Sequence, residues 1–130
     1  MKKPKKCISV ESAKKLQKKW KESRAKDIDL VQGYQDTREF WYSVEELQEY
    51  LDYVKRKSLD QKILNPGIRI YFGAYQKSSI RNSYATVFLA PTKARPVLSE
   101  GEDETSVNAE NNYLIEPFNE SSGGMPPFTY

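Results

Sequence analysis

The clearest pattern of hydrophobic and polar positions is SVEELQEYLDYVKRKS, residues 43–58. Four aliphatic side chains recur there at the spacing of one helical face: Val44, Leu47, Leu51 and Val54. Ser43 and Glu46 have the spacing of a capping box, in which each side chain bonds a backbone N–H of the first turn. The pattern therefore predicts an amphipathic helix that begins at residue 44.

A second helix is predicted earlier in the chain, from Val10 to Gln32. Ser9 is the expected N-cap, and Gly33 the expected left-handed residue just past the end. Its apolar stripe is thin and imperfect, with Leu16 and Trp20 as its large members. We expect only a narrow face of this helix to be buried.

Three further segments have the pattern of strands. The aromatic run DTREFWYS, residues 36–43, predicts a short strand. The turn NPG, residues 65–67, has type II chemistry with a positive φ at glycine, and a strand should follow it. YATVFLAP, residues 84–91, is apolar on both faces and predicts an interior antiparallel partner that ends at Pro91.

The strand after the turn, within NPGIRIYFGAYQ, alternates between two kinds of face. The aliphatic face, expected to lie under a helix, consists of Ile68, Ile70, Phe72 and Ala74. The other face carries Arg69, Tyr71 and Tyr75 around Gly73. Aromatic and basic side chains on a sheet face can stack bases or contact a protein, or simply cover the sheet with their hydroxyls in water. These three residues are the candidate binding surface.

The C-terminal third is more polar. Residues 92–112, with the acidic run EGEDET, are expected to form a mobile loop. YLIEPF, residues 113–118, has the pattern of one further edge strand. Residues 119–130, rich in Gly and Pro, are expected to form an irregular tail.

The predicted fold class is α+β: two helices packed on one face of a small, mainly antiparallel sheet, in the order α-β-α-β-β with a possible further edge strand. A chain of 130 residues fits a single domain. Within it, residues 1–8 are a basic N-terminal extension.

The hairpin also carries a resemblance. NPGIRIYFGAYQ followed by YATVFLAPTK, after FWYSVEELQEYLDYV, resembles a set of small uncharacterised bacterial proteins. The similarity covers roughly the first two thirds of the chain. It implies a bacterial origin and a compact domain, and it implies no site, substrate or activity.

Composition excludes several kinds of catalytic and metal site. Cys7 is the only cysteine, so an intramolecular disulfide and a multi-cysteine zinc site are excluded. A signal-peptide apolar run and a span of roughly 20 apolar residues are both missing, so we expect a cytoplasmic protein without a membrane partner. The chain has no histidine, which removes His-activated nucleophiles and His-ligated metals.

No residue pattern predicts a catalytic site, a metal site or a cofactor. Carboxylate, lysine or tyrosine chemistry stays open. An enzyme with a small-molecule pocket under the 92–112 loop is therefore kept as a minor hypothesis.

Charge is uneven along the chain. Residues 1–26 carry eleven Lys and Arg against two Glu, a net charge of +9, while the remainder carries −6. One side of the first predicted helix gathers four of these lysines: Lys14, Lys15, Lys18 and Lys21. Such a face can follow a phosphate backbone, can rest against the chain's own EGEDET segment, or can be an ordinary solvated surface.

The sequence thus favours a small non-enzymatic binding or interaction domain with a protein partner. The alternative is binding of nucleic acid or another polyanion through the lysine face.

Overall fold

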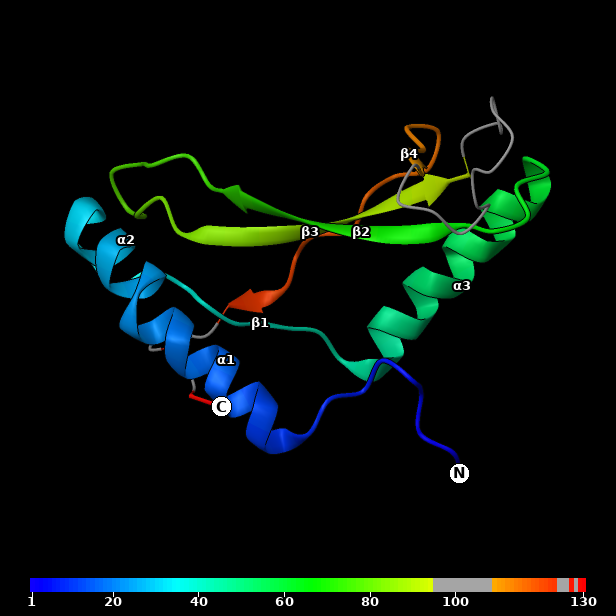
Figure 1. The fold of residues 1–130 in the computed structure, drawn as a ribbon. Coiled ribbons are helices and arrows are strands. Elements are labelled where there is room, and N and C mark those ends of the chain that lie inside the picture. The colour runs from blue at the N-terminus through cyan, green and yellow to red at the C-terminus, as the bar shows by residue number, and fades with distance from the viewer. Residues whose placement is uncertain (95–108, 124–126, 128) are drawn as a thin grey trace, which may run out of the picture. The chain divides into compact units, whose positions relative to one another are not determined.

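A computed structural model describes residues 1–94, 109–123, 127 and 129–130 (Figure 1). The elements in chain order are α1 (Val10–Glu22), α2 (Arg24–Gln32), β1 (Phe40–Trp41), α3 (Val44–Asp60), β2 (Gly67–Ala74), β3 (Ala85–Lys93), β4 (Glu110–Asn111) and β5 (Ser122–Gly123). Strands β2, β3 and β4 form one antiparallel sheet, and β1 pairs with β5. The predicted α+β class is confirmed.

Two compact units make up the chain. The first consists of Met1–Glu39 with Gly123–Tyr130, and the second consists of Phe40–Ser122. Each is described by itself below. The interpretation of residues 1–130 as a single domain stays a prediction.

In the first unit, the single helix predicted over residues 10–32 is wrong. The helix breaks at Ser23, whose φ of −123° and ψ of −88° are not helical. The Ser23 hydroxyl donates to the carbonyl oxygen of Lys19, a side-chain bond that competes with the helical backbone ladder. Both predicted ends are confirmed: Ser9 Oγ accepts from Ser12 N at 3.0 Å, and Gly33 ends α2 with a φ of 80°.

In the second unit, β3 is the central strand of its sheet (Figure 1). It pairs with β2 along its whole length and with β4 at Thr92 and Lys93. The prediction that Pro91 ends this strand is wrong. The Pro91 carbonyl accepts from Asn112 N at 2.8 Å, on the side away from β2, so β2 needs no N–H from the proline.

The core of the second unit lies where α3 crosses the sheet. Its buried members are Tyr50, Val54, Leu89 and Ile115. Val44 is 85% exposed, so the helix buries the Tyr50 side of the predicted stripe rather than its first residue. Ser43 Oγ accepts from Glu46 N at 3.0 Å, which confirms the predicted cap.

The predicted aliphatic core face of β2 is wrong over most of its length. Ile68 packs against the core, but Ile70 is 65% and Phe72 is 74% exposed. Alternation identifies the residues that share a face, and it does not say how far the covering helix runs along that face. Here α3 lies at the Gly67 end of the hairpin (Figure 1).

The reason for glycine at position 67 also differs from the prediction. Among the described residues Gly33 is the only glycine with a positive φ, so Gly67 does not need the left-handed region. A Cβ at Gly67 would instead lie 2.7 Å from Thr92 Oγ1 on the paired strand. Space, and not backbone conformation, requires this glycine.

The predicted boundaries of the C-terminal segments change. Thr92 and Lys93 belong to β3, and Glu110 and Asn111 form β4, so the 92–112 loop is shorter at both ends than predicted. Residues 95–108 of it, with the EGEDET run, lie outside the described residues. YLIEPF is not a regular strand, although Phe118 and Leu89 exchange two backbone bonds of 2.8 and 2.9 Å. In the predicted tail, Ser122–Gly123 form β5, and residues 124–126 and 128 lie outside the described residues.

Candidate functional site

The predicted tyrosine-bearing face of β2 holds a segment of the chain itself. Arg69 donates to Asn111 Oδ1 at 2.6 Å and to the Ala109 carbonyl at 2.9 Å. Asn111 Nδ2 in turn donates to the Tyr71 hydroxyl at 2.8 Å. This bond, with Arg69 nearby, lowers the pKa of Tyr71 below its ordinary value. Arg69 and Tyr71 therefore serve to fix the segment around β4 on the sheet.

Tyr75 is engaged in the same way. Its hydroxyl donates to Asn119 Oδ1 at 3.0 Å, and the Arg81 guanidinium lies 3.9 Å from the centre of its ring. Arg69, Tyr71 and Tyr75 are all half-buried. Their polar ends already have hydrogen-bond or cation–π partners within the chain. Their role as a partner-binding surface stays a prediction.

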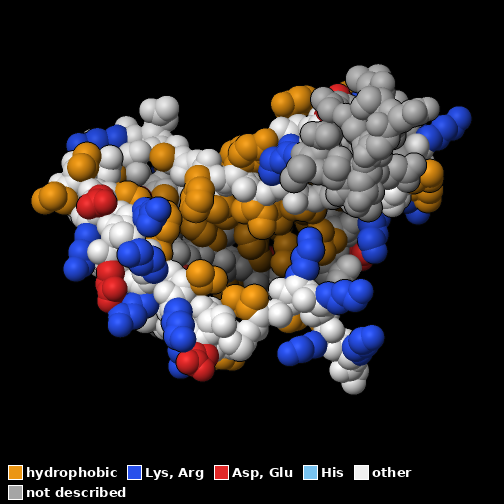
Figure 2. Space-filling view, viewed as in Figure 1, with side chains coloured by type: hydrophobic (Ala, Val, Ile, Leu, Met, Phe, Trp, Pro, Cys, Tyr) orange, Lys and Arg blue, Asp and Glu red, His pale blue; other side chains and the backbone are white. Residues whose placement is uncertain are grey.

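The predicted lysine face lies on α1 in the first unit. Lys15 and Lys18 pair with Glu11 at 3.5 Å and Glu22 at 3.8 Å, and both lysine side chains are more than 70% exposed. Lys21 Nζ donates to Thr129 Oγ1 at 3.2 Å, and Lys14 is exposed. Figure 2, in which Lys and Arg are blue, shows several such side chains over the region of α1 and α2. Exposed pairs of this kind contribute little stability, so the lysines remain available to an anion.

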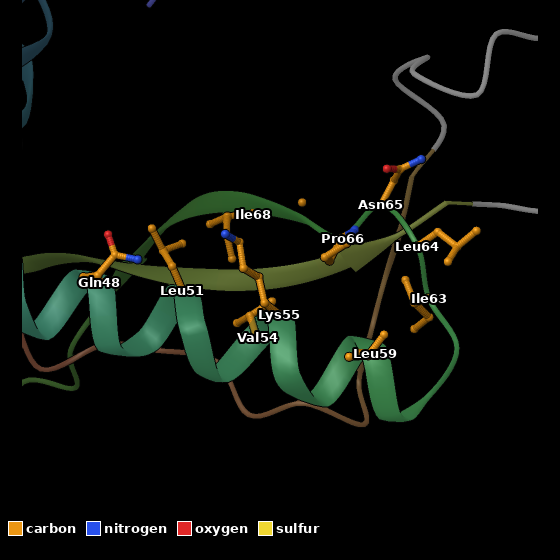
Figure 3. Close-up of a pocket in the computed structure, with 11 residues that line it drawn as sticks. Gln48, Leu51, Val54, Lys55, Leu59, Ile63, Leu64, Asn65, Pro66 and Ile68 are labelled. Atoms are coloured by element: carbon orange, nitrogen blue, oxygen red, sulfur yellow. The ribbon is translucent and has the colours of Figure 1, made fainter. Parts of the chain in front are cut away.

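A groove with an apolar lining lies in the second unit between α3 and the start of β2 (Figure 3). Its volume is about 640 Å³. From α3 it is lined by Leu51, Val54, Lys55 and Leu59, and from the turn and β2 by Ile63, Leu64, Pro66 and Ile68. Leu59 is 66% and Leu64 is 87% exposed, so the aliphatic wall is open to solvent. Lys55 is the one charged side chain in this lining. We call this concavity the α3 groove.

The α3 groove lies beside a sheet edge. Among the described strands β2 pairs with β3 alone. Tyr75 N donates to the Tyr84 carbonyl at 3.0 Å, so the hydrogen-bonded pairs of the ladder include Arg69 and Tyr71. The N–H and C=O groups of Ile68 and Ile70 must then point away from β3. The outward backbone groups of Ile68 and Ile70 therefore lie next to the apolar side chains of the α3 groove.

Among the described residues no group of three or more His, Cys, Asp or Glu side chains is placed to hold a metal ion. No described helix has both the length and the apolar character needed to cross a membrane.

No protein-family model, curated protein or solved structure matches this chain.

Sequence reasoning missed the α3 groove. Leu59, Ile63 and Leu64 lie beyond the i, i+3, i+7 stripe that defined the helix. Three large aliphatic residues within six positions, next to the NPG turn, were the available signal. Their convergence with Leu51 depends on how the turn folds back along α3, which periodicity does not determine.

Proposed function

We propose that the chain is a small non-enzymatic binding domain of the bacterial cytoplasm that captures an extended apolar segment of a partner protein. The observation that carries the proposal is the α3 groove, with its exposed Leu59 and Leu64, beside the outer edge of β2. Segments that add a strand to a sheet edge gain affinity from backbone bonds and specificity from side-chain pockets. The groove and the edge supply these two elements.

The chemistry of the lining defines the partner segment. Aliphatic side chains on both walls favour Leu, Ile, Val or Phe in the segment. Lys55 favours an acidic residue next to them. Lys57 and Lys62, both exposed nearby in the chain, favour an acidic residue as well. The proposed partner is therefore an apolar segment with an acidic flank.

The proposal is tested by selecting short linear peptides from a display library on the full chain. We expect selected peptides to combine aliphatic and acidic residues. Leu64→Glu, which places a charge on the groove wall, should weaken the best peptide at least about tenfold. Lys55→Glu should shift selection toward basic flanks.

The matched control is Ile80→Glu, because Ile80 is 94% exposed in the same unit and does not line the groove. It should leave peptide affinity unchanged. Equal losses in the Leu64 and Ile80 variants, or peptides without apolar residues, would contradict the proposal.

Polyanion binding by the first unit is the second candidate, favoured by the net charge of +9 over residues 1–26. Fluorescence anisotropy of labelled DNA and RNA oligomers, titrated at several salt concentrations, tests it. Binding that weakens steeply with salt and is lost when Lys14, Lys15, Lys18 and Lys21 become Glu would support it. No binding at low salt would make the lysines a solvated face.

A further inference from the structure

A second concavity lies on the opposite face of the sheet from the α3 groove. Strand residues Tyr71, Phe88 and Ala90 form its floor, and residues 111–117 form its other wall. Its volume is about 390 Å³, within the range of small-molecule sites. We call it the sheet cavity.

Hydrogen bonds fix the wall of the sheet cavity that residues 111–117 form. Asn112 is 3% exposed; its Nδ2 donates to Gln61 Oε1 at 2.8 Å, and its Oδ1 accepts from Leu114 N at 3.1 Å. The Glu116 carbonyl accepts from the Tyr50 hydroxyl at 2.9 Å. The wall is therefore anchored at both ends before any ligand arrives, which lowers the entropic cost of binding.

Aromatic rings dominate the interior. Tyr71 and Phe88 stack on adjacent strands with ring centres 5.2 Å apart, and Tyr113, which is 88% exposed, lies at the mouth. Ring faces attract cations because their π-electrons carry partial negative charge. Pro91, Ile115 and Pro117 complete an apolar lining.

One charge is present in the lining, the exposed carboxylate of Glu116. Arg69 is bound to the neutral groups of Asn111 and Ala109 and does not line the cavity, and Lys93 lines an adjoining hollow. In the lining itself a ligand meets aromatic faces and one negative charge. Both favour a cation over an anion of the same size.

We propose that the sheet cavity binds a small organic cation, an amine or quaternary ammonium group with an apolar body. The body lies on Tyr71 and Phe88, and the cationic group lies between Tyr113 and the Glu116 carboxylate. The sheet cavity shares no lining residue with the α3 groove. A failure of this proposal would therefore not contradict the proposed function, and the reverse also holds.

The test is an NMR titration of the full chain with three probes of similar shape: benzyltrimethylammonium, neutral benzyl alcohol and anionic benzenesulfonate. We expect the cation to bind at least about fivefold more tightly than either other probe, with shifts at Ala90, Tyr113 and Glu116. A short peptide with trimethyl-lysine separates two sources of the cation: tighter binding than the free probe indicates a protein side chain, and weaker binding a free small molecule.

Two variants make the test specific. Glu116→Gln and Tyr113→Ala, both at exposed positions, should each weaken the cation about threefold or more. Glu45→Gln, an exposed carboxylate on α3, should change nothing. Equal affinity for the three probes, shifts that lie outside the sheet cavity, or full affinity in both variants would overturn the proposal.

Discussion

Tyr50 of α3 contacts the segment that returns to the sheet at Glu116 and Phe118. It is 7% exposed, and its ring stacks on Phe118 with centres 4.6 Å apart. Its hydroxyl lies 2.9 Å from the Glu116 carbonyl and 3.3 Å from the Leu89 carbonyl. A hydroxyl has one hydrogen to donate, so the shorter contact with Glu116 is the main bond.

Burial raises the pKa of Tyr50 to about 12 from 10.0. The folded state keeps this proton at a pH where the unfolded chain has lost it. The contribution of Tyr50 to stability is therefore complete below pH 10 and is lost as the pH rises from 10 to about 12. We expect urea unfolding followed from about pH 9 to about pH 12 to show this loss. Tyr50→Phe should reduce the slope of the free energy of unfolding against pH. An unchanged slope in the variant would contradict the assignment.

Gly67 is required for space opposite Thr92. Gly67→Ala should lower the free energy of unfolding by about 1 to 3 kcal/mol, because the new Cβ collides with Thr92 Oγ1. Gly73→Ala, where the nearest atom lies 3.4 Å away, is the matched control and should cost less. Thr92→Ala should restore part of the loss in the double variant. Equal effects of the two glycine changes in denaturant titrations would refute the explanation.

At the scale of elements, α3 is the best-specified part of the chain. Its cap at Ser43 and its apolar spacing could be predicted from the sequence, and its first residue is the predicted one. The break at Ser23 was not predictable, because a serine inside a helical pattern is ordinarily tolerated. The bond from the Ser23 hydroxyl to the Lys19 carbonyl appears only in the structure, because periodicity does not report side-chain bonds.

Ser43→Ala removes the cap of α3, and we expect a loss of about 1 kcal/mol in the free energy of unfolding. Ser9→Ala removes the equivalent cap of α1, a helix without a buried residue. Ser9→Ala should therefore leave the unfolding of the second unit, followed by the fluorescence of Trp41 in a Trp20→Phe background, unchanged. Equal effects of the two changes on that signal would contradict the expectation that the Ser9 cap contributes nothing to the stability of the second unit.

The hairpin shows where sequence patterns stop being informative. Strand alternation in β2 and the pairing with β3 were predictable, since periodicity is a local property. The covered length of the aliphatic face was not, because it depends on where α3 crosses the sheet. Ile70 is exposed for that reason, although its pattern is the same as that of half-buried Ile68.

At the scale of the whole molecule, the candidate site was only partly predictable. Arg69, Tyr71 and Tyr75 were found by residue type, but the residues that they bind, Ala109, Asn111 and Asn119, lie outside the edge strand predicted at residues 113–118. The α3 groove needs the helix, the turn and the strand edge together. Such a site arises from tertiary packing and leaves only a weak trace in the sequence.

The most direct measurement is residue-resolved amide hydrogen exchange of β2, in the free chain and with the best selected peptide bound. In the free chain, Arg69 and Tyr71 should exchange slowly, and Ile68 and Ile70 faster, because the latter point away from β3. The peptide should slow the exchange of Ile68 and Ile70 at least about tenfold. Protection that appears elsewhere, or unchanged exchange at Ile68 and Ile70 in the bound state, would contradict strand addition at the α3 groove.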